Sequence, residues 1–462
     1  MKRKFFKNKI FIVTTSIVLV VAIMLGVLLP ILLKPRSEWY PWGDITLPQE
    51  GSLTLPIIEI STENKKMPQD KVTYINSSFK LSNTIDDEKF GIDIEMKDEY
   101  GAKDSVGIRL RGNTTIGYPK KPLRIKFDKK QSMFGSVSNK SWVLLADYLD
   151  PSLIKNYSGL SLAKIFDNMP WSATGTHVNL YLNGNYKGVF LLADQVDEKE
   201  GRLNLATNND YKEGQKDYPF LVEMDSLIYE DTTISPEDIF NVSAFNNSPA
   251  EIKYPESGDG RPTDATNFIV SYVNNVFNAL LAGDIETFEN LVDVNSFIDY
   301  ILVNEIMSNS DAIWKSIYIS KKVGQKMTFG PVWDFDGGFG LWSGEPNDTE
   351  QNAHFAFETV YSSDCLFVSQ FYLNAGQQGF NQVASRFDFL KNQLNKFTID
   401  LENYKTILQN DAKYNQEWYP KLGEIFEKNF NANILFLQNH NAFLNSLFEG
   451  DYNNFMQIVY KL

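Results

Sequence analysis

Apolar and polar positions alternate over short runs in the first half of the chain and follow helical spacing over longer segments in the second half. Short alternating runs bounded by turn residues are typical of strands, and longer segments with the spacing of a helical turn are typical of helices. Strands are predicted at 56–61, 71–75, 91–96, 105–111, 123–127, 177–182, 186–192 and 220–224. Helices are predicted at 151–166, across 264–308 and over much of 380–460.

The simplest arrangement of these elements is an α+β fold with two lobes. Residues 55–197 would form a β-rich N-lobe, and residues 198–462 would form a helix-rich C-lobe. The segment 206–260 is polar and is expected to be irregular around its single strand at 220–224. Asn183-Gly184 lies between two predicted strands and is a strong signal for a tight β-hairpin.

The N-terminus combines a basic segment with an uncharged apolar stretch. Residues 1–9 include five Lys or Arg residues, and residues 10–33 form a 24-residue stretch without a charge. A helix of that length spans about 36 Å, enough to cross the hydrocarbon core of a membrane. The basic flank favours a cytoplasmic N-terminus, which places the body of the chain outside the membrane after a linker at 34–54. A cleaved signal peptide is the alternative, and it would export the same body.

Composition narrows the chemistry that this body can carry. The net charge is −14, which argues against nucleic acid as a partner because binding to its phosphates needs a basic surface. The single cysteine, Cys365, excludes an intrachain disulfide, and an exported protein without disulfides suggests a bacterium that does not cross-link its surface proteins. The chain has only His177, His354 and His440, which argues against a histidine-rich zinc site and leaves a Ser-His-Asp triad few candidate bases.

Three aspartates flank a β-hairpin that is predicted within residues 311–340. A hairpin returns the chain to its starting point, so Asp311 should lie close to Asp334 and Asp336. The last two are hard oxygen ligands that lie two residues apart and precede two glycines, a pattern that suits Mg²⁺ or Mn²⁺. The alternatives are a turn cap at Asp311 and a solvated acidic turn at the other two.

Six sequence blocks, read in order, carry a resemblance to a known family. They are RLRGNTT at 109–115, PKKPLRIKF at 119–127, WVLLA at 142–146, DPSLIKN at 150–156, LNGNYKGVF at 182–190 and GPVWDFD at 330–336. Through these blocks the segment 55–345 resembles the CotH kinases, atypical protein kinases related to a spore coat protein. The resemblance implies an atypical kinase-like bilobal fold that uses ATP with Mg²⁺ or Mn²⁺.

The resemblance also implies roles for the residues around the hairpin. Asp311 would orient and deprotonate the acceptor hydroxyl, while Asp334 and Asp336 would bind the metal ion on the phosphates of ATP. Kinase loops usually place a second metal-binding Asn five residues after the catalytic Asp, and here that position is Ser316. A serine oxygen ligates Mg²⁺ in phosphate-binding loops, so the number of metal ions stays open.

Residues of the predicted N-lobe would hold the nucleotide. Arg124 and Lys126 share one face of a strand, and the resemblance implies that these two and Arg111 contact the phosphates. The alternative is that Arg124 and Lys126 belong to a solvated strand face and bind no ligand. Gln195 follows the strand at 186–192, where an interlobe hinge would contact adenine.

One part of a typical kinase is absent from the sequence. The helix that is predicted after Asp150 has no acidic residue before Asp167, so it cannot supply the Glu that usually pairs with the nucleotide-binding Lys. Asp147 and Asp150 are the nearest substitutes.

Three functions are therefore considered for this chain. The first is a membrane-anchored, outward-facing kinase that transfers the γ-phosphoryl group of ATP to Ser or Thr of a protein on the cell or spore surface. The second is the same fold without catalysis, acting as a surface assembly or binding module, which Ser316 and the missing helix acid favour. The third is a glycan-active surface protein, because the 8 Trp and 22 Tyr residues could stack on sugars and paired carboxylates can hydrolyse glycosides.

Overall fold

The structure is a computed structural model. It describes residues 48–49, 51–82, 105–134, 136–205, 212–339, 366–416 and 425–460. The proposed membrane span at 10–33 and the predicted strand at 91–96 lie outside these residues. Within the described ranges, no helix has the length and apolar character that crossing a membrane requires.

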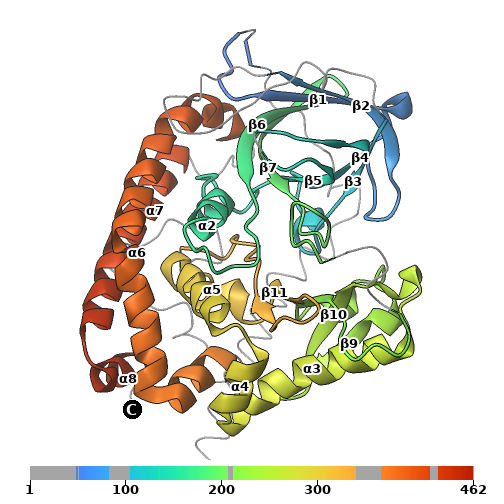
Figure 1. The fold of residues 1–462 in the computed structure, drawn as a ribbon. Coiled ribbons are helices and arrows are strands. Elements are labelled where there is room, and N and C mark those ends of the chain that lie inside the picture. Colours follow the sequence, from blue (N-terminus) through green and yellow to red (C-terminus); the bar gives the residue numbers. More distant parts are fainter. Residues whose placement is uncertain are drawn as a thin grey trace, which may run out of the picture.

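The first part of the described chain forms a closed barrel with the strand order β1-β2-β3-β4-β5-β7-β6. Parallel pairing of β1 with β6 closes it, and the other neighbouring strands pair antiparallel (Figure 1). The strands are β1 (Ile57–Thr62), β2 (Ile75–Ser82), β3 (Val106–Leu110), β4 (Leu123–Gln131), β5 (Asn139–Leu145), β6 (Gly175–Leu182) and β7 (Asn185–Asp194). The prediction of a strand at 71–75 was wrong, because the strand only begins at the last of these residues.

Alternation along the strands explains how the core of the barrel forms. On β4 the side chains of Leu123, Ile125 and Phe127 are buried in the barrel core, whereas Lys126 between them is exposed. The turn between β6 and β7 has positive φ at both Asn183 (56°) and Gly184 (83°). Asn and Gly tolerate this backbone region better than other residues, which confirms the predicted hairpin.

A second sheet of five strands, in the order β12-β11-β8-β10-β9, lies below the barrel in Figure 1. Its strands are β8 (Phe220–Met224), β9 (Ile239–Val242), β10 (Ser248–Tyr254), β11 (Ile317–Lys321) and β12 (Thr328–Phe329). The prediction of a single strand within 206–260 was therefore wrong, because β9 and β10 also form there. The hairpin of β11 and β12 is confirmed.

Helices cover this second sheet and one side of the barrel. They are α2 (Lys155–Ala163), α3 (Thr263–Ala282), α4 (Ile285–Leu291), α5 (Val294–Met307), α6 (Leu366–Asn415), α7 (Ile425–Glu449) and α8 (Tyr452–Tyr460). The 50-residue α6 bends at Gly376, which has a non-helical backbone, and runs along the side of the molecule up to the barrel (Figure 1). The mixed α+β class is confirmed, and the boundary predicted at residue 197 stays a prediction.

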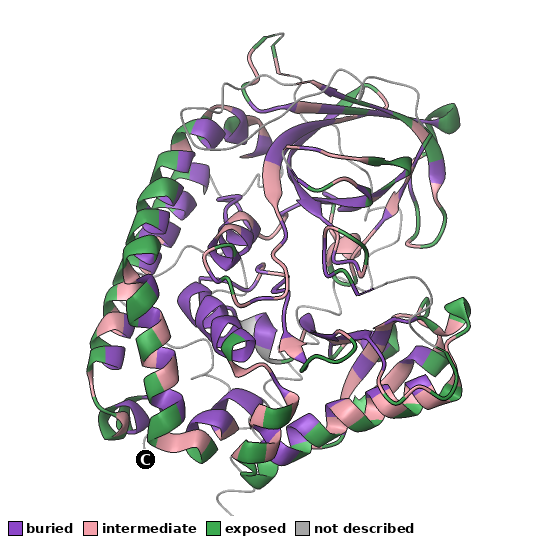
Figure 2. Ribbon diagram, viewed as in Figure 1, coloured by how far each residue is buried: buried purple, intermediate pink, exposed green. Residues whose placement is uncertain are grey.

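One large apolar core joins the two parts of the molecule. It includes residues of β5 and β7, of α2, of the second sheet and of helices α3 to α8, while a smaller core fills the barrel. Figure 2 shows α2 and α5 almost entirely buried in the middle of the molecule, whereas α6 and α7 expose their outer faces. The end of β5, the start of α2 and β11 all contribute residues to this core, and the candidate site lies where they meet.

Candidate active site

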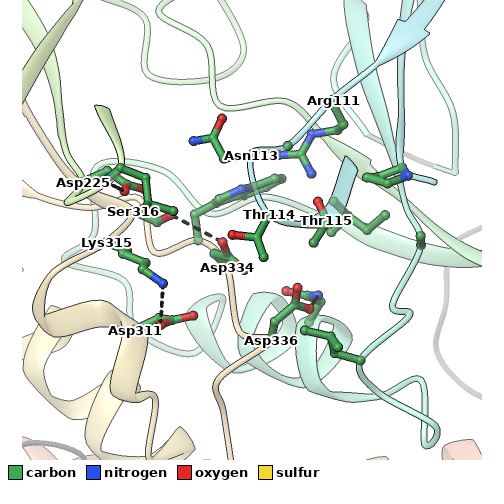
Figure 3. Close-up of a pocket in the computed structure, with 18 of the residues that line it drawn as sticks. Arg111, Asn113, Thr114, Thr115, Asp225, Asp311, Lys315, Ser316, Asp334 and Asp336 are labelled. Atoms are coloured by element: carbon green, nitrogen blue, oxygen red, sulfur yellow. Dashed lines mark hydrogen bonds and ion pairs between the residues drawn. The ribbon is translucent and has the colours of Figure 1, made fainter. Parts of the chain in front are cut away.

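A cavity of about 330 Å³ lies between the barrel and the second sheet. Its barrel side consists of the turn after β3, the end of β5 and the following loop, and its other side consists of β8, the hairpin and the segment after β12. The charged residues that line it are Arg111, Asp147, Glu223, Asp225, Asp311, Lys315, Asp334 and Asp336. The structure therefore brings Asp311, Ser316, Asp334, Asp336 and Arg111 of the predicted site together (Figure 3).

Asp311 lies on a single 3₁₀ turn, Ser310–Ile313, between α5 and the hairpin. Its carbonyl accepts hydrogen bonds from the amide nitrogens of Trp314 (3.0 Å) and Lys315 (2.8 Å), which fixes the backbone of the turn. Its Oδ1 is 3.7 Å from Lys315 Nζ and accepts no hydrogen bond within the described residues. Burial, and then the negative charge of Asp334, raise the pKa of Asp311 to about 6.

Asp334 and Asp336 follow β12 in an extended segment whose backbone is unusual. Asp334 has a φ of 62°, in the left-handed region that non-glycine residues seldom adopt. Burial raises the pKa of Asp334, and the positive charges of Arg111 and Lys315 oppose this rise. The pKa of Asp336 is raised well above its ordinary value, first by burial and then by the charge of Asp334. A cation between these carboxylates would relieve both effects.

Ser316 also has a positive φ, of 52°, and its Oγ is 3.5 Å from Asp334 Oδ2. This distance is at the limit of a hydrogen bond, so the two oxygens are close without being tightly bound to each other. The hairpin thus brings the hydroxyl of Ser316 beside Asp334, one of the two carboxylates predicted to bind metal. Its role as a ligand stays a prediction.

Asn156, in the first turn of α2, connects the barrel side of the cavity to the aspartate segment. Its Nδ2 donates hydrogen bonds to Asp147 Oδ1 (2.8 Å) and to Asp336 Oδ1 (2.7 Å), and its Oδ1 accepts one from the amide nitrogen of Phe335 (2.8 Å). Sequence reasoning sought an acidic residue on this helix and overlooked the amide. The signal was available, since Asn156 ends one of the family blocks.

The two proposed substitutes for the missing helix acid differ in their surroundings. Burial raises the pKa of Asp147 to about 7, while burial lowers that of Lys120, with which it interacts, to about 7. Asp150 instead accepts hydrogen bonds from the amide nitrogens of Ser152 (2.9 Å) and Lys155 (2.8 Å) and fixes the start of α2. Of the two, only Asp147 lines the cavity.

Arg124, Lys126 and Gln195 do not line the cavity. Lys126 is exposed, with its Nζ 5.8 Å from the centre of the Tyr74 ring, and Gln195 Nε2 donates to the carbonyl of Val196. For Arg124 and Lys126 the reason is that polar side chains of β4 point out of the barrel, whereas the cavity lies beyond the ends of the barrel strands. This placement does not support their predicted contacts with a nucleotide, and the cations that line the cavity are Arg111 and Lys315.

The donor set of the cavity fits a hard divalent cation. Protein sites for Mg²⁺ in nucleotide enzymes combine one or two carboxylates with phosphate and water oxygens, and Asp334 and Asp336 supply two half-buried carboxylates. Within the described residues, no three carboxylate, histidine or cysteine side chains converge as a complete metal cage. The residues that would hold the ion are therefore Asp334 and Asp336, with Ser316 adjacent.

Glu223 and Asp225, at the end of β8, extend the acidic side of the cavity. Burial, and then the charge of Glu223, raise the pKa of Asp225 to about 7. Beside the cavity, Lys71 Nζ contacts both Asn113 Oδ1 (2.8 Å) on the barrel side and Asp231 Oδ2 (2.6 Å) on the side of the second sheet. Sequence reasoning missed these residues because β8 becomes a neighbour of β11 only in the folded sheet.

A family model described as "CotH kinase protein" matches residues 108–441, more than half of the chain. The chain belongs to the CotH kinase family. The match contains every residue that lines the cavity, and it extends beyond the predicted segment 55–345 into α6 and α7. Membership of the CotH kinase family indicates a kinase-like function that depends in general on a nucleotide and a divalent metal ion. A search of curated proteins finds no match to the chain.

Proposed function

We propose that this protein transfers the γ-phosphoryl group of ATP, with Mg²⁺ or Mn²⁺, to a Ser or Thr hydroxyl of an exported or surface protein. One observation carries the proposal. A single cavity in a CotH kinase chain gathers Asp311, the carboxylates of Asp334 and Asp336, and the cations Arg111 and Lys315. Phosphoryl transfer requires mainly positioning and charge stabilisation, which this set of residues supplies.

The cavity offers different surfaces to the two ends of a nucleotide. The turn after Arg111 begins at Gly112, where φ is 89° and a Cβ would overlap Thr115 Oγ1, so the turn requires glycine there. Turns of this kind can present backbone N–H groups to phosphate oxygens. The aromatic rings of Tyr118, Tyr148 and Trp333 line the same cavity and provide flat apolar surfaces for a base.

In the proposed reaction the acceptor oxygen attacks the γ-phosphorus, and the bond from that phosphorus to the β,γ-bridging oxygen breaks. ADP leaves with the electron pair of that bond. The ionised carboxylate of Asp311 orients the acceptor hydroxyl and takes its proton. Lys315, 3.7 Å from that carboxylate, adds positive charge where the transferred group carries negative charge. A metal ion on Asp334 and Asp336 would neutralise phosphate charge.

We also propose that residues 10–33 anchor the protein, with the N-terminus in the cytoplasm and the cavity outside. The 24-residue uncharged stretch and its basic flank support this placement. The acceptor would then be a protein on the cell or spore surface.

Substitution of Asp311 by Ala tests the proposal. Transfer should fall by about 10²–10⁴-fold, the usual contribution of a positioned acid or base. Binding of ATP with Mg²⁺ should persist, because Asp334, Asp336 and Arg111 remain. The measurement is incorporation of labelled phosphate into the protein itself or a casein-like acceptor, with nucleotide binding followed by thermal shift.

Asp293→Ala is a matched control. Asp293 caps α5 through a hydrogen bond from the amide of Asn295 (3.1 Å) and lies outside the cavity. It should lose about 1 kcal/mol of stability and keep its transfer rate. Equal transfer by wild type and Asp311→Ala would exclude Asp311 from catalysis. A wild type that binds ATP without transferring phosphate would support the non-catalytic surface module, which Ser316 and the acid-free α2 favour.

A further inference from the structure

We propose that one face of α2, formed by Asn156 and Gly159, is the positioning device for the metal-binding segment 334–336. The proposal rests on the proposed metal-dependent function. The two residues lie three apart in α2 and therefore on the same side of the helix. Asn156 contacts the backbone and a carboxylate of the segment, and Gly159 accommodates the ring at its centre.

The side-chain amide of Asn156 forms hydrogen bonds through both of its N–H groups and through its carbonyl oxygen. It has two N–H donors and one carbonyl acceptor; the donors bind Asp147 Oδ1 and Asp336 Oδ1, and the acceptor binds the amide of Phe335. Rotating the amide by half a turn would place its oxygen against two carboxylates, so the network fixes its orientation. Asn156 is only 5% exposed, which keeps water from replacing these bonds.

The residue at this position must be neutral and must donate twice. Asp147 Oδ1 and Asp336 Oδ1 lie against the same nitrogen of Asn156, so two negatively charged groups that repel each other are held close together there. An Asp at position 156 would add a third negative charge, and even in its protonated form it would have a single donor. An amide lets both carboxylates lie against one nitrogen without adding charge. This explains why an amide suits this position of α2 better than an acid.

Gly159 supplies the second contact. A Cβ at this position would overlap the ring of Phe335, which is fully buried between Asp334 and Asp336. The ring therefore packs directly on the backbone of α2. Because Phe335 separates the two aspartates, its position determines where both carboxylates point.

The test measures Mn²⁺ binding by full-length protein, following free Mn²⁺ by electron paramagnetic resonance without nucleotide. Residues that hold metal ligands in place typically contribute about 10–100-fold to metal affinity. Asn156→Ala, Asn156→Asp and Gly159→Ala should each weaken Mn²⁺ binding by about this factor.

Asn179→Asp is the matched control. Asn179 is also fully buried, donates to Asp411 Oδ2 (2.6 Å) and accepts from the Tyr186 hydroxyl (2.7 Å), but it lies on β6 away from the cavity. It should lower stability while leaving Mn²⁺ affinity unchanged. Folding of each variant is checked by near-ultraviolet circular dichroism.

Unchanged Mn²⁺ affinity in folded Asn156→Ala or Gly159→Ala protein would overturn the proposal, as would a wild type that binds no Mn²⁺. If the Asn156 variants do not fold, the Mn²⁺ affinity of Gly159→Ala decides the question. That variant keeps the side chain of Asn156 and acts on the packing of Phe335. The readout does not depend on phosphoryl transfer. A wild type that binds Mn²⁺ and transfers no phosphate would refute the proposed function and leave this inference standing.

Discussion

Asp334 and Asp336 lie two residues apart, yet their surroundings differ. Asp334 is the nearer to positive charge, since Arg111 and Lys315 both counteract the rise in its pKa. Asp336 is held by Asn156 and has two carboxylates, Asp334 and Asp147, as neighbours. The two side chains are therefore not equivalent, although either could ligate a cation.

Replacing Asp334 by Asn should abolish the stabilisation that ATP gives in the presence of Mg²⁺, because the change removes a charged ligand while keeping the side-chain volume. Asp336→Asn should have a similar effect. The measurement is the thermal shift by ATP with and without Mg²⁺. Asp238→Asn serves as a control, since Asp238 is a buried carboxylate paired with Arg261 (2.6 Å) outside the cavity. Undiminished metal-dependent shifts in both cavity variants would remove this pair as the metal site.

At the scale of elements, the long helix α6 is tied to the barrel by polar contacts. Asp411 near its end accepts hydrogen bonds from the amide of Leu55 (2.8 Å) and from Asn179 (2.6 Å). His177 on β6 joins three elements, because Nε2 donates to the carbonyl of Leu153 (2.7 Å) before α2, and Nδ1 accepts from the Tyr404 hydroxyl (2.9 Å) on α6. These contacts fix α2, and with it Asn156, relative to the barrel.

The burial of His177 predicts a pH dependence of stability. Burial lowers the pKa of His177 from 6.5 to about 3, so below pH 6.5 the unfolded chain binds a proton that the folded chain does not. Stability is then lost as the pH falls from 6.5 towards 3, by about 2 kcal/mol at pH 5 from this residue.

Urea unfolding of wild type and His177→Gln at pH 7 and pH 5 measures this contribution. The stability advantage of wild type should shrink at the lower pH. Tyr404→Phe, which removes one hydrogen bond and keeps the imidazole buried, should retain the pH dependence of wild type. An advantage that is the same at both pH values would show that folding does not lower the pKa of His177.

At the scale of the whole molecule, the barrel and the second sheet share one apolar core, and the cavity lies where they meet. Within the part of the chain that the structure describes, every residue of this core lies after residue 54. A chain that begins near Ser37 should therefore express as a monodisperse protein with the fold intact, because it lacks only the apolar stretch 10–33 and its flanks. Membrane fractionation and size-exclusion chromatography check this outcome. Partitioning of the shortened protein into membranes would contradict a single N-terminal anchor.

The sequence by itself determined the mixed α+β class, the β11–β12 hairpin and the Asn-Gly turn, because local alternation and turn chemistry dictate them. It also placed Asp311 beside Asp334 and Asp336, since a hairpin returns the chain to its start. The sequence-based prediction failed for residues whose spatial neighbours are distant in the chain. Lys126 has a suitable charge, but the direction in which β4 points it follows from barrel closure.

Only the tertiary structure decided which residues complete the cavity. Asn156 lies 180 residues from Asp336 along the chain, and the hydrogen bond between them exists because α2 packs against the segment that follows β12. Glu223 and Asp225 enter the cavity because β8 pairs with β11. The raised pKa values follow from burial, which a sequence does not display. Local patterns fixed the elements, and packing between distant segments fixed the chemistry at their junction.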